Sequence, residues 1–243
     1  MALVLVTGAS TGLGLATATA LAADGHDVVL HARNAGRLED PSVLDRMYGV
    51  VYGDLSRPEE TVEVGRQADA IGTFDAVVHN AGVMRGGAVL AVNTVAPFVL
   101  TATMTPPERA IFLSSGMHFS GSPQRLEPDF AAPGRTSYAD SKLFVTALAL
   151  ALARRWPQTV SHAVDPGWVP TRMGGPSAPE SLEDGRTTQV WLATAEEDSI
   201  DPRTGGYWYH EAVRAPHAAA SDPRFQDAVV DVLEARTGFA LPR

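Results

Sequence analysis

The chain has 243 residues, of which 45% are hydrophobic, with no cysteine and a formal net charge of −9 at pH 7. This length and apolar content predict one domain over residues 1–243 with a single core. The lack of cysteine excludes disulfides and thiolate chemistry and favours a cytoplasmic location. The acidic balance, without a basic run, argues against a nucleic-acid partner.

No stretch of the sequence suits a membrane span or a signal peptide. The longest apolar run, residues 143–153, is too short to cross a bilayer. The first six residues, MALVLV, lead directly into Thr7 without a basic segment. We therefore expect no membrane partner and no export.

The first predicted strand, residues 2–7, runs into a glycine-rich turn and then a predicted helix over residues 15–23. Glycines allow a sharp turn and a close approach of the backbone to a pyrophosphate, and the N–H groups at a helix start bind anions. The order of strand, turn and helix predicts a dinucleotide-binding site, although an ordinary turn would share the pattern. The candidate residues are Gly8, Ser10, Thr11, Gly12, Leu13 and Gly14.

A second predicted strand, residues 27–32, ends without the acid that usually binds the adenosine ribose of NAD. Arg33 follows instead and can pair with a 2′-phosphate, which favours NADP over NAD. A solvated loop arginine is the alternative. A third predicted strand, residues 48–53, precedes Asp54 and Leu55, which we place beside the adenine; an acid capping a strand end would look the same.

Strands and helices continue to alternate along the chain. A helix over residues 58–70 precedes a fourth strand over residues 75–79, which ends in Asn80-Ala81-Gly82. Such alternation predicts a parallel sheet covered on both faces, with ligands at the carboxyl ends of the strands. Further predicted elements are strands over residues 111–113, 159–164 and 205–209 and a helix over residues 223–236.

The strongest chemical signal is the segment SYADSK, which begins at residue 137. Lys142 is the only lysine among 19 basic residues, and Tyr138 lies four residues before it. The apolar, helix-forming run that follows predicts that both side chains lie one turn apart on one helix face. An ammonium beside a phenol lowers the phenol's pKa and creates an acid–base group. A surface tyrosine–lysine pair is the alternative.

Taken together and in this order, the motifs resemble those of the short-chain dehydrogenase/reductase family. The resemblance extends from Leu3 to about Thr171, and an insert over residues 116–137 is similar to that of retinol-type carbonyl reductases. It implies a Rossmann-type α/β fold, a doubly wound parallel sheet of about seven strands with helices on both faces. The residues that carry it are the glycine turn, Asn80-Ala81-Gly82, Asn93, Ser114-Ser115, Tyr138, Lys142 and Asp165-Pro166-Gly167.

The resemblance also implies roles for individual residues. Tyr138 would be the general acid, and Lys142 would lower its pKa and bind the nicotinamide ribose. Ser115 would bind the substrate carbonyl, with Ser114 as the fallback, and Asn93 would hold a relay water. The remaining implied cofactor-binding residues are Asn80, Ala81, Gly82, Pro166, Gly167, Val169 and Thr171.

The expected function is NADPH-dependent reduction of a ketone or aldehyde to an alcohol. An apolar or aromatic substrate is expected from Phe119, Trp168, Met173 and Trp191, with pocket walls formed by the insert and a flap over residues 172–190. Three alternatives remain: an NAD-linked alcohol dehydrogenase working oxidatively, a sugar-nucleotide epimerase or dehydratase, and a non-catalytic NADP-binding redox-sensing regulator.

Two further expectations concern assembly and metals. The short spacing between Gly82, Asn93 and the fifth strand predicts a short helix. In many members of the family this helix builds the subunit interface, so a monomer or dimer is expected rather than a tetramer. The seven histidines show no metal-binding spacing, so no metal site is expected.

Overall fold

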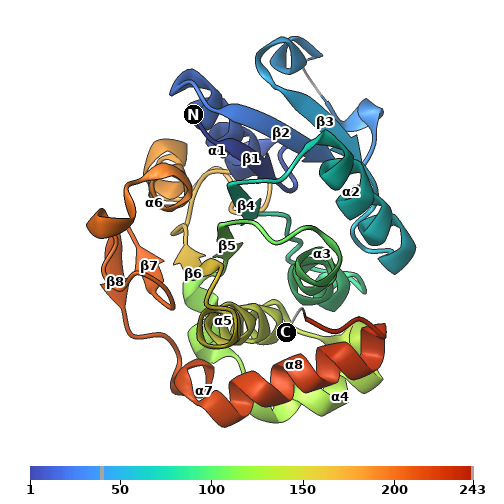
Figure 1. Ribbon diagram of the computed structural model, residues 1–243. Coiled ribbons are helices and arrows are strands. Elements are labelled where there is room, and N and C mark those ends of the chain that lie inside the picture. The colour runs from blue at the N-terminus through green and yellow to red at the C-terminus, as the bar shows by residue number, and fades with distance from the viewer. Residues whose placement is uncertain (39–40, 242–243) are drawn as a thin grey trace.

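The computed structural model describes residues 1–38 and 41–241, which form an α/β structure around one eight-stranded sheet of order β3-β2-β1-β4-β5-β6-β7-β8 (Figure 1). The strand order reverses between β1 and β4, which makes the fold a doubly wound Rossmann type. The strands are β1 Leu3–Val6, β2 Asp27–Ala32, β3 Gly49–Tyr52, β4 Ala76–His79, β5 Arg109–Leu113, β6 Val160–Asp165, β7 Tyr207–Tyr209 and β8 Ala212–Arg214.

The sequence predicts about seven strands, whereas the sheet has eight, and the strand that was not predicted is β8. Strands β1 to β7 pair in parallel, whereas β8 pairs antiparallel with β7 at the sheet edge. His210 and Glu211 reverse the chain between them with positive φ angles of 50° and 57°. All three residues of β8 are exposed, so this strand lacks the apolar pattern by which the others were predicted.

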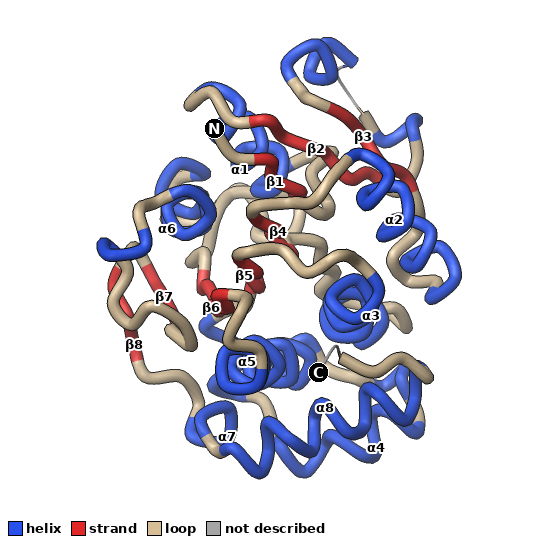
Figure 2. The backbone as a smooth tube through the Cα atoms, in the orientation of Figure 1, coloured by secondary structure: helices blue, strands red, loops and turns tan. Residues whose placement is uncertain are grey.

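Helices cover both faces of the sheet, as Figures 1 and 2 show. Helices α1 and α6 lie on one face, and α2, α3 and α5 lie on the other. The helices are α1 Gly12–Ala23, α2 Pro58–Ile71, α3 Ala96–Thr103, α4 Leu126–Ala131, α5 Tyr138–Arg155, α6 Leu182–Thr194, α7 Ala218–Ser221 and α8 Pro223–Thr237.

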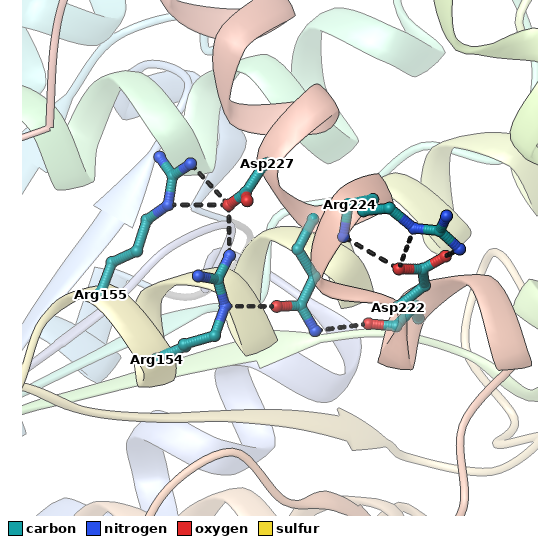
Figure 3. A network of polar contacts seen from close by, with 7 residues as sticks. Arg154, Arg155, Asp222, Arg224 and Asp227 are labelled. Carbon is teal, nitrogen blue, oxygen red and sulfur yellow. Dashed lines mark hydrogen bonds and ion pairs between the residues drawn. The ribbon is translucent and has the colours of Figure 1, made fainter.

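Helix α5 is the best buried helix, because it lies between the sheet and the C-terminal helices. Every residue from 140 to 152 is buried. Its outer side packs against α7 and α8, and the ring of Phe144 lies 6.3 Å from that of Phe130 in α4. At its C-terminal end, Arg154 and Arg155 both pair with Asp227 of α8 (Figure 3). The helix that begins at Tyr138 is therefore held along its full length, which fixes the position of the residues in its first turns.

Two predicted boundaries change. The flap predicted over residues 172–190 ends at Ser181, because Ser181 and Asp184 form a capping box that starts α6 at Leu182. The insert over residues 116–137 is not all pocket wall, because Leu126 and Phe130 of α4 join the core around α5. The predicted short helix near Asn93 corresponds to a helical segment over residues 89–103, in which a π-helical turn, Ala91–Val95, precedes α3.

Candidate active site

The glycine turn follows β1 and packs closely against the loop that follows β4. Gly8 and Gly12 have φ angles of 64° and 59°, a left-handed conformation that favours glycine. A Cβ atom on Gly8 would lie 2.7 Å from Ala81 Cα, and one on Gly14 would lie 2.3 Å from Asn80 Nδ2. Side chains at these positions would push the two loops apart, so the cradle depends on glycine.

Hydrogen bonds join the same two loops. Asn80 Nδ2 donates to the Thr7 carbonyl at 2.9 Å, and Ala81 N donates to Thr7 Oγ1 at 3.0 Å. The loop after β6 reaches the turn as well, because the Thr171 side chain lies 3.5 Å from where a Cβ on Gly12 would be. Three segments predicted to bind the cofactor therefore meet at the point where the strand order reverses.

The residues predicted near the adenosine lie at the ends of β2 and β3. Arg33 Nε lies 3.5 Å from Asp54 Oδ2, and the Arg33 side chain is 52% exposed. Ser10 and Thr11 are half-buried in the turn, whereas Leu55 is buried in the core beneath α2 and offers no side chain to a ligand. The exposed guanidinium of Arg33 is thus one cationic group at this end, and the exposed guanidinium of Arg57 also acts on Asp54.

The loop after β6 packs closely against α6. Val169 is buried, and its Cγ1 lies 2.4 Å from where a Cβ on Gly185 of α6 would be. This Cβ position on Gly185 also lies 3.0 Å from the Pro166 carbonyl oxygen and 3.4 Å from Leu13 Cδ1. Gly167 has a φ of 76°, which turns the chain after Pro166. Helix α6 therefore holds this loop beside the glycine turn.

Tyr138 and Lys142 lie one turn apart at the start of α5, as predicted. Ser137 caps the helix by accepting a hydrogen bond from Asp140 N at 3.0 Å. Lys142 is buried, and its Nζ donates to the Leu113 carbonyl at 2.6 Å and lies 5.5 Å from the centre of the Tyr138 ring. Lys142 Nζ also lies 3.7 Å from where a Cβ on Gly82 would be. The ammonium thus connects the tyrosine with the cofactor loop.

The pKa of the phenol differs from the expectation. Burial raises the pKa of Tyr138 to about 12, which outweighs the lowering by a hydrogen bond with the Ser115 side chain. Burial also lowers the pKa of Lys142 to about 8, although the carboxylate of Asp165 opposes this. The net shift of the Tyr138 pKa is thus upward, opposite to the expected lowering, because desolvation of the phenol is the largest influence.

The two adjacent serines lie in different environments. Ser114 is buried, and its hydroxyl lies 2.6 Å from Thr146 Oγ1 in the interior of α5. Ser115 is half-buried, accepts from Met117 N at 3.2 Å and hydrogen-bonds Tyr138. Successive residues at a strand end point to opposite sides. Ser115 is therefore the serine on the tyrosine side, and Ser114 belongs to the core.

Asn93 holds the cofactor loop against α5. Its Oδ1 accepts from Val83 N at 2.8 Å, and its Nδ2 donates to the Val83 carbonyl at 2.9 Å and to Ser141 Oγ at 3.0 Å. Ser141 Oγ in turn donates to the Tyr138 carbonyl at 2.7 Å. These contacts occupy the Asn93 side chain, which belongs to a π-helical turn of the kind frequent at functional sites.

Asp165 and Tyr207 belong to this site but were not among the predicted site residues. The Tyr207 hydroxyl donates to Asp165 Oδ2 at 3.1 Å, and Gly167 N donates to Asp165 Oδ1 at 3.1 Å. The carboxylate raises the pKa of both Tyr138 and Lys142. An acid at the end of a predicted strand, directly before Pro166-Gly167, was a signal that could have identified Asp165; Tyr207 depended on tertiary structure.

Exposed apolar side chains gather in the segments that flank Ser115 and Asp165. Met117 and Phe119 follow Ser115, and Trp168 and Met173 belong to the segment after β6; all four are exposed. Trp191 was expected to join them, but its ring packs 5.2 Å from that of Trp208, on the α6 face of the sheet. Burial against Trp208 therefore removes Trp191 from the pocket wall.

Two other kinds of feature are not found in the part of the chain that the structure describes. Over residues 1–38 and 41–241, no helix is both long enough and apolar enough to cross a membrane. Within the same residues, no three His, Cys, Asp or Glu side chains come together as metal ligands would.

Comparison with known proteins agrees with this geometry. The family model described as short chain dehydrogenase matches residues 2–125. The short-chain dehydrogenase chry4 of Gibberella zeae is 38% identical over 259 residues, which cover 100% of this chain and 99% of that protein.

Solved structures share the fold. An uncharacterized protein from Mycobacterium paratuberculosis superposes with a TM-score of 0.80 at 21% identity, covering 100% of this chain and 96% of that one. The NADPH-bound carbonyl reductase from chicken fatty liver gives a TM-score of 0.71 at 21% identity, covering 87% and 98%. With its glycine turn, its Tyr138–Lys142 pair and its relationship to chry4, the chain belongs to the short-chain dehydrogenase/reductase family.

Proposed function

We propose that this protein is an NADPH-dependent oxidoreductase that reduces a ketone or aldehyde to an alcohol. The observation that carries the proposal is the meeting of Ser115, Tyr138 and Lys142 beside the cofactor loop at Gly82. Acid–base, oxyanion and cofactor-binding groups then lie at one edge of the sheet, where this fold binds ligands.

The glycine cradle fits a dinucleotide, because its backbone has left-handed turns at Gly8 and Gly12 and leaves no room for side chains at Gly8 and Gly14. Its residues would hold the pyrophosphate at the start of α1. The exposed guanidinium of Arg33 would bind a 2′-phosphate, which supports NADP(H) over NAD(H). The chicken carbonyl reductase, which has the same fold, was solved with NADPH.

In the proposed reaction, NADP(H) supplies the hydride. Ser115 donates a hydrogen bond to the substrate carbonyl oxygen and stabilises the negative charge that develops there. Tyr138 transfers its phenolic proton to that oxygen, which completes the alcohol, and the Lys142 ammonium stabilises the phenolate that remains. The backbone of Asn93 supports the return of a proton to Tyr138.

The Tyr138 phenol is protonated at neutral pH, and burial, which raises its pKa to about 12, reinforces this state. A phenol with this pKa carries its proton at neutral pH, as a general acid requires, whereas oxidation of an alcohol would need the phenolate as a base. An NAD-linked dehydrogenase working oxidatively is therefore the second candidate. Preferential binding of NAD over NADP in a titration would favour it.

The substrate is proposed to be apolar or aromatic. Four exposed apolar side chains, Met117, Phe119, Trp168 and Met173, lie in the segments adjoining Ser115 and Asp165. Exposed groups of this kind gain free energy when an apolar ligand covers them. A screen of aliphatic and aromatic ketones and aldehydes, read by NADPH oxidation, tests this proposal.

The same screen tests the activity itself. Turnover of a carbonyl by the wild-type chain, together with its loss in a Tyr138→Phe variant that still binds NADPH, would support the proposed function. A chain that binds NADPH and reduces nothing in the screen would favour the non-catalytic redox-sensing regulator.

We further propose that the protein is a monomer or a dimer rather than a tetramer. The outer side of α5, the helix that carries Tyr138 and Lys142, is covered by α7 and α8 of the same chain. Arg154 and Arg155 are paired with Asp227 of α8, so the end of the helix is also occupied. Light scattering should give a mass of about 25.7 kDa or twice that, and a mass four times larger would contradict the proposal.

A further inference from the structure

His31, at the end of β2, lies between the glycine turn and the end of β3. Its side chain is buried, and its two ring nitrogens contact different loops. Gly8 N donates to His31 Nδ1 at 3.0 Å, and His31 Nε2 lies 3.0 Å from the Gly53 carbonyl oxygen. The ring therefore joins the turn proposed to bind the pyrophosphate to the residue directly before Asp54.

These contacts determine the protonation state of the ring. A backbone N–H can only donate, so Nδ1 must accept from Gly8 and cannot carry a proton. A carbonyl oxygen can only accept, so Nε2 must carry the proton and donate it to Gly53. The ring is thus a neutral imidazole with its proton on Nε2. A proton added to Nδ1 would place two donors against each other at Gly8.

Few charged groups face the ring. Asp54, which follows β3, favours the protonated ring and Arg33 disfavours it. The Glu60 carboxylate on α2 accepts from Asp54 N at 2.7 Å and pairs with Arg57. Burial is the largest influence and lowers the pKa of His31 below its ordinary value. Protonation therefore requires a lower pH than for an ordinary histidine, and the neutral ring is present at pH 7.

We propose that His31 is a positioning residue for cofactor binding: its neutral ring fixes the glycine turn to the end of β3, and protonation of the ring releases Gly8 and weakens dinucleotide binding. This inference deepens the proposed function and rests on it. The ring does not touch the ligand in this scheme. It acts through Gly8, whose left-handed backbone leaves little freedom to adjust.

The test measures dinucleotide affinity against pH in variants of residue 31. Titration calorimetry with NADP⁺ and with NAD⁺ between pH 5 and 7.5 would compare the wild type with His31→Gln and His31→Leu. Glutamine can accept and donate as the neutral ring does, but it does not titrate. Leucine keeps the apolar volume and removes both hydrogen bonds. The 2′-phosphate of NADP⁺ also titrates, but equally for every variant. The ratio of variant to wild-type affinity at each pH therefore removes its contribution.

We expect His31→Gln to bind NADP⁺ within about threefold of the wild type at pH 7.5 and His31→Leu to bind about tenfold more weakly, the effect of one lost hydrogen bond. As the pH falls from 7.5, the wild type should lose affinity relative to His31→Gln, by about tenfold once the ring is protonated. A ratio that stays constant with pH, or a leucine variant that binds like the wild type, would overturn the proposal.

His162→Gln is the matched control. His162 is also buried and accepts through Nδ1 from Gly206 N at 3.1 Å, but it joins β6 to the segment before β7 and does not contact the glycine turn. This variant should keep the pH dependence of the wild type. If it abolishes that dependence, the effect does not belong to His31 and the proposal fails.

A measurement without ligand separates this inference from the proposed function. Nitrogen-15 NMR of the His31 ring should show the neutral tautomer with its proton on Nε2 at pH 7. A proton on Nδ1 would overturn the positioning role even if NADP⁺ binds. Because this measurement uses the wild type, it tests the inference even if His31→Leu fails to fold. A wild type with the expected tautomer that binds neither dinucleotide at any pH would instead overturn the proposed function, and the inference with it.

Discussion

The two halves of the site are built differently. On the cofactor side, backbone packs against backbone, as where a Cβ on Gly8 would meet Ala81 at 2.7 Å. On the substrate side, the segments after Ser115 and Gly167 present exposed Phe119 and Trp168. The first half admits few substitutions because each would separate two loops, whereas the second can change side chains without disturbing the fold. The sequence therefore indicates the cofactor class more directly than the substrate.

Tyr138→Phe should give the largest difference between the two halves of the site, because it should affect turnover and not cofactor binding. Removing the phenolic proton should lower turnover about 100- to 10,000-fold, the usual contribution of a general acid. NADPH binding should persist, because the cradle at Gly8 and Gly14 does not depend on the hydroxyl. Steady-state kinetics and a fluorescence titration check the two expectations. Retained turnover would remove Tyr138 from the mechanism.

Ser115→Ala and Ser114→Ala test which of the two adjacent serines contacts the substrate carbonyl. Loss of the donor to the oxyanion should cost about 100- to 1,000-fold in kcat for Ser115→Ala. Ser114→Ala should leave kcat near wild type and cost about 1 kcal/mol of stability, because it breaks the hydrogen bond with Thr146. The opposite pattern in kcat and unfolding measurements would exchange the two roles.

Arg33→Asp examines the cofactor side alone. A charged hydrogen bond to a 2′-phosphate contributes about 1.5–3 kcal/mol, so NADPH affinity should fall at least about tenfold while NADH binding holds or improves. The new carboxylate would also lie beside Asp54 and repel the phosphate. Paired titrations with NADPH and NADH measure the preference. An unchanged ratio of NADPH affinity to NADH affinity would mean that Arg33 is a solvated loop residue without a role in cofactor choice.

Lys142 lies where the two halves join, and its buried charge should appear in the stability of the protein. Its pKa is about 8 in the folded state and near its ordinary 10.5 when unfolded, so between these values the unfolded chain binds more protons. The free energy of unfolding should therefore rise with pH, by at most about 1.4 kcal/mol per unit.

Denaturant unfolding between pH 8.5 and 9.5 measures this slope without interference from another lysine, because the chain has no other. The raised pKa of Tyr138 acts in the opposite sense only above pH 10, where the unfolded phenol begins to ionise. Lys142→Met should remove the slope. A wild type whose stability is flat or falls over this interval would contradict the buried charge.

Most of the fold was predictable because its signals are local. The predicted strand over residues 27–32 and the helix over residues 58–70 match β2 and α2 within a residue, since buried strands and capped helices leave short-range patterns. Exposed β8 has no such pattern, and the end of the flap at Ser181 depended on a cap. Trp191 was misplaced because composition does not tell which aromatic faces the core.

By itself the sequence determined the order of strands and helices, the glycine cradle and the pairing of Tyr138 with Lys142 on one helix turn, because each depends on residues close together in the chain. Tertiary structure decided which serine faces the tyrosine, that Asp165 and Tyr207 lie beside it, and that His31 connects two loops. It also reversed the expected direction of the Tyr138 pKa shift, because desolvation depends on everything packed around a group and not on its neighbours in sequence.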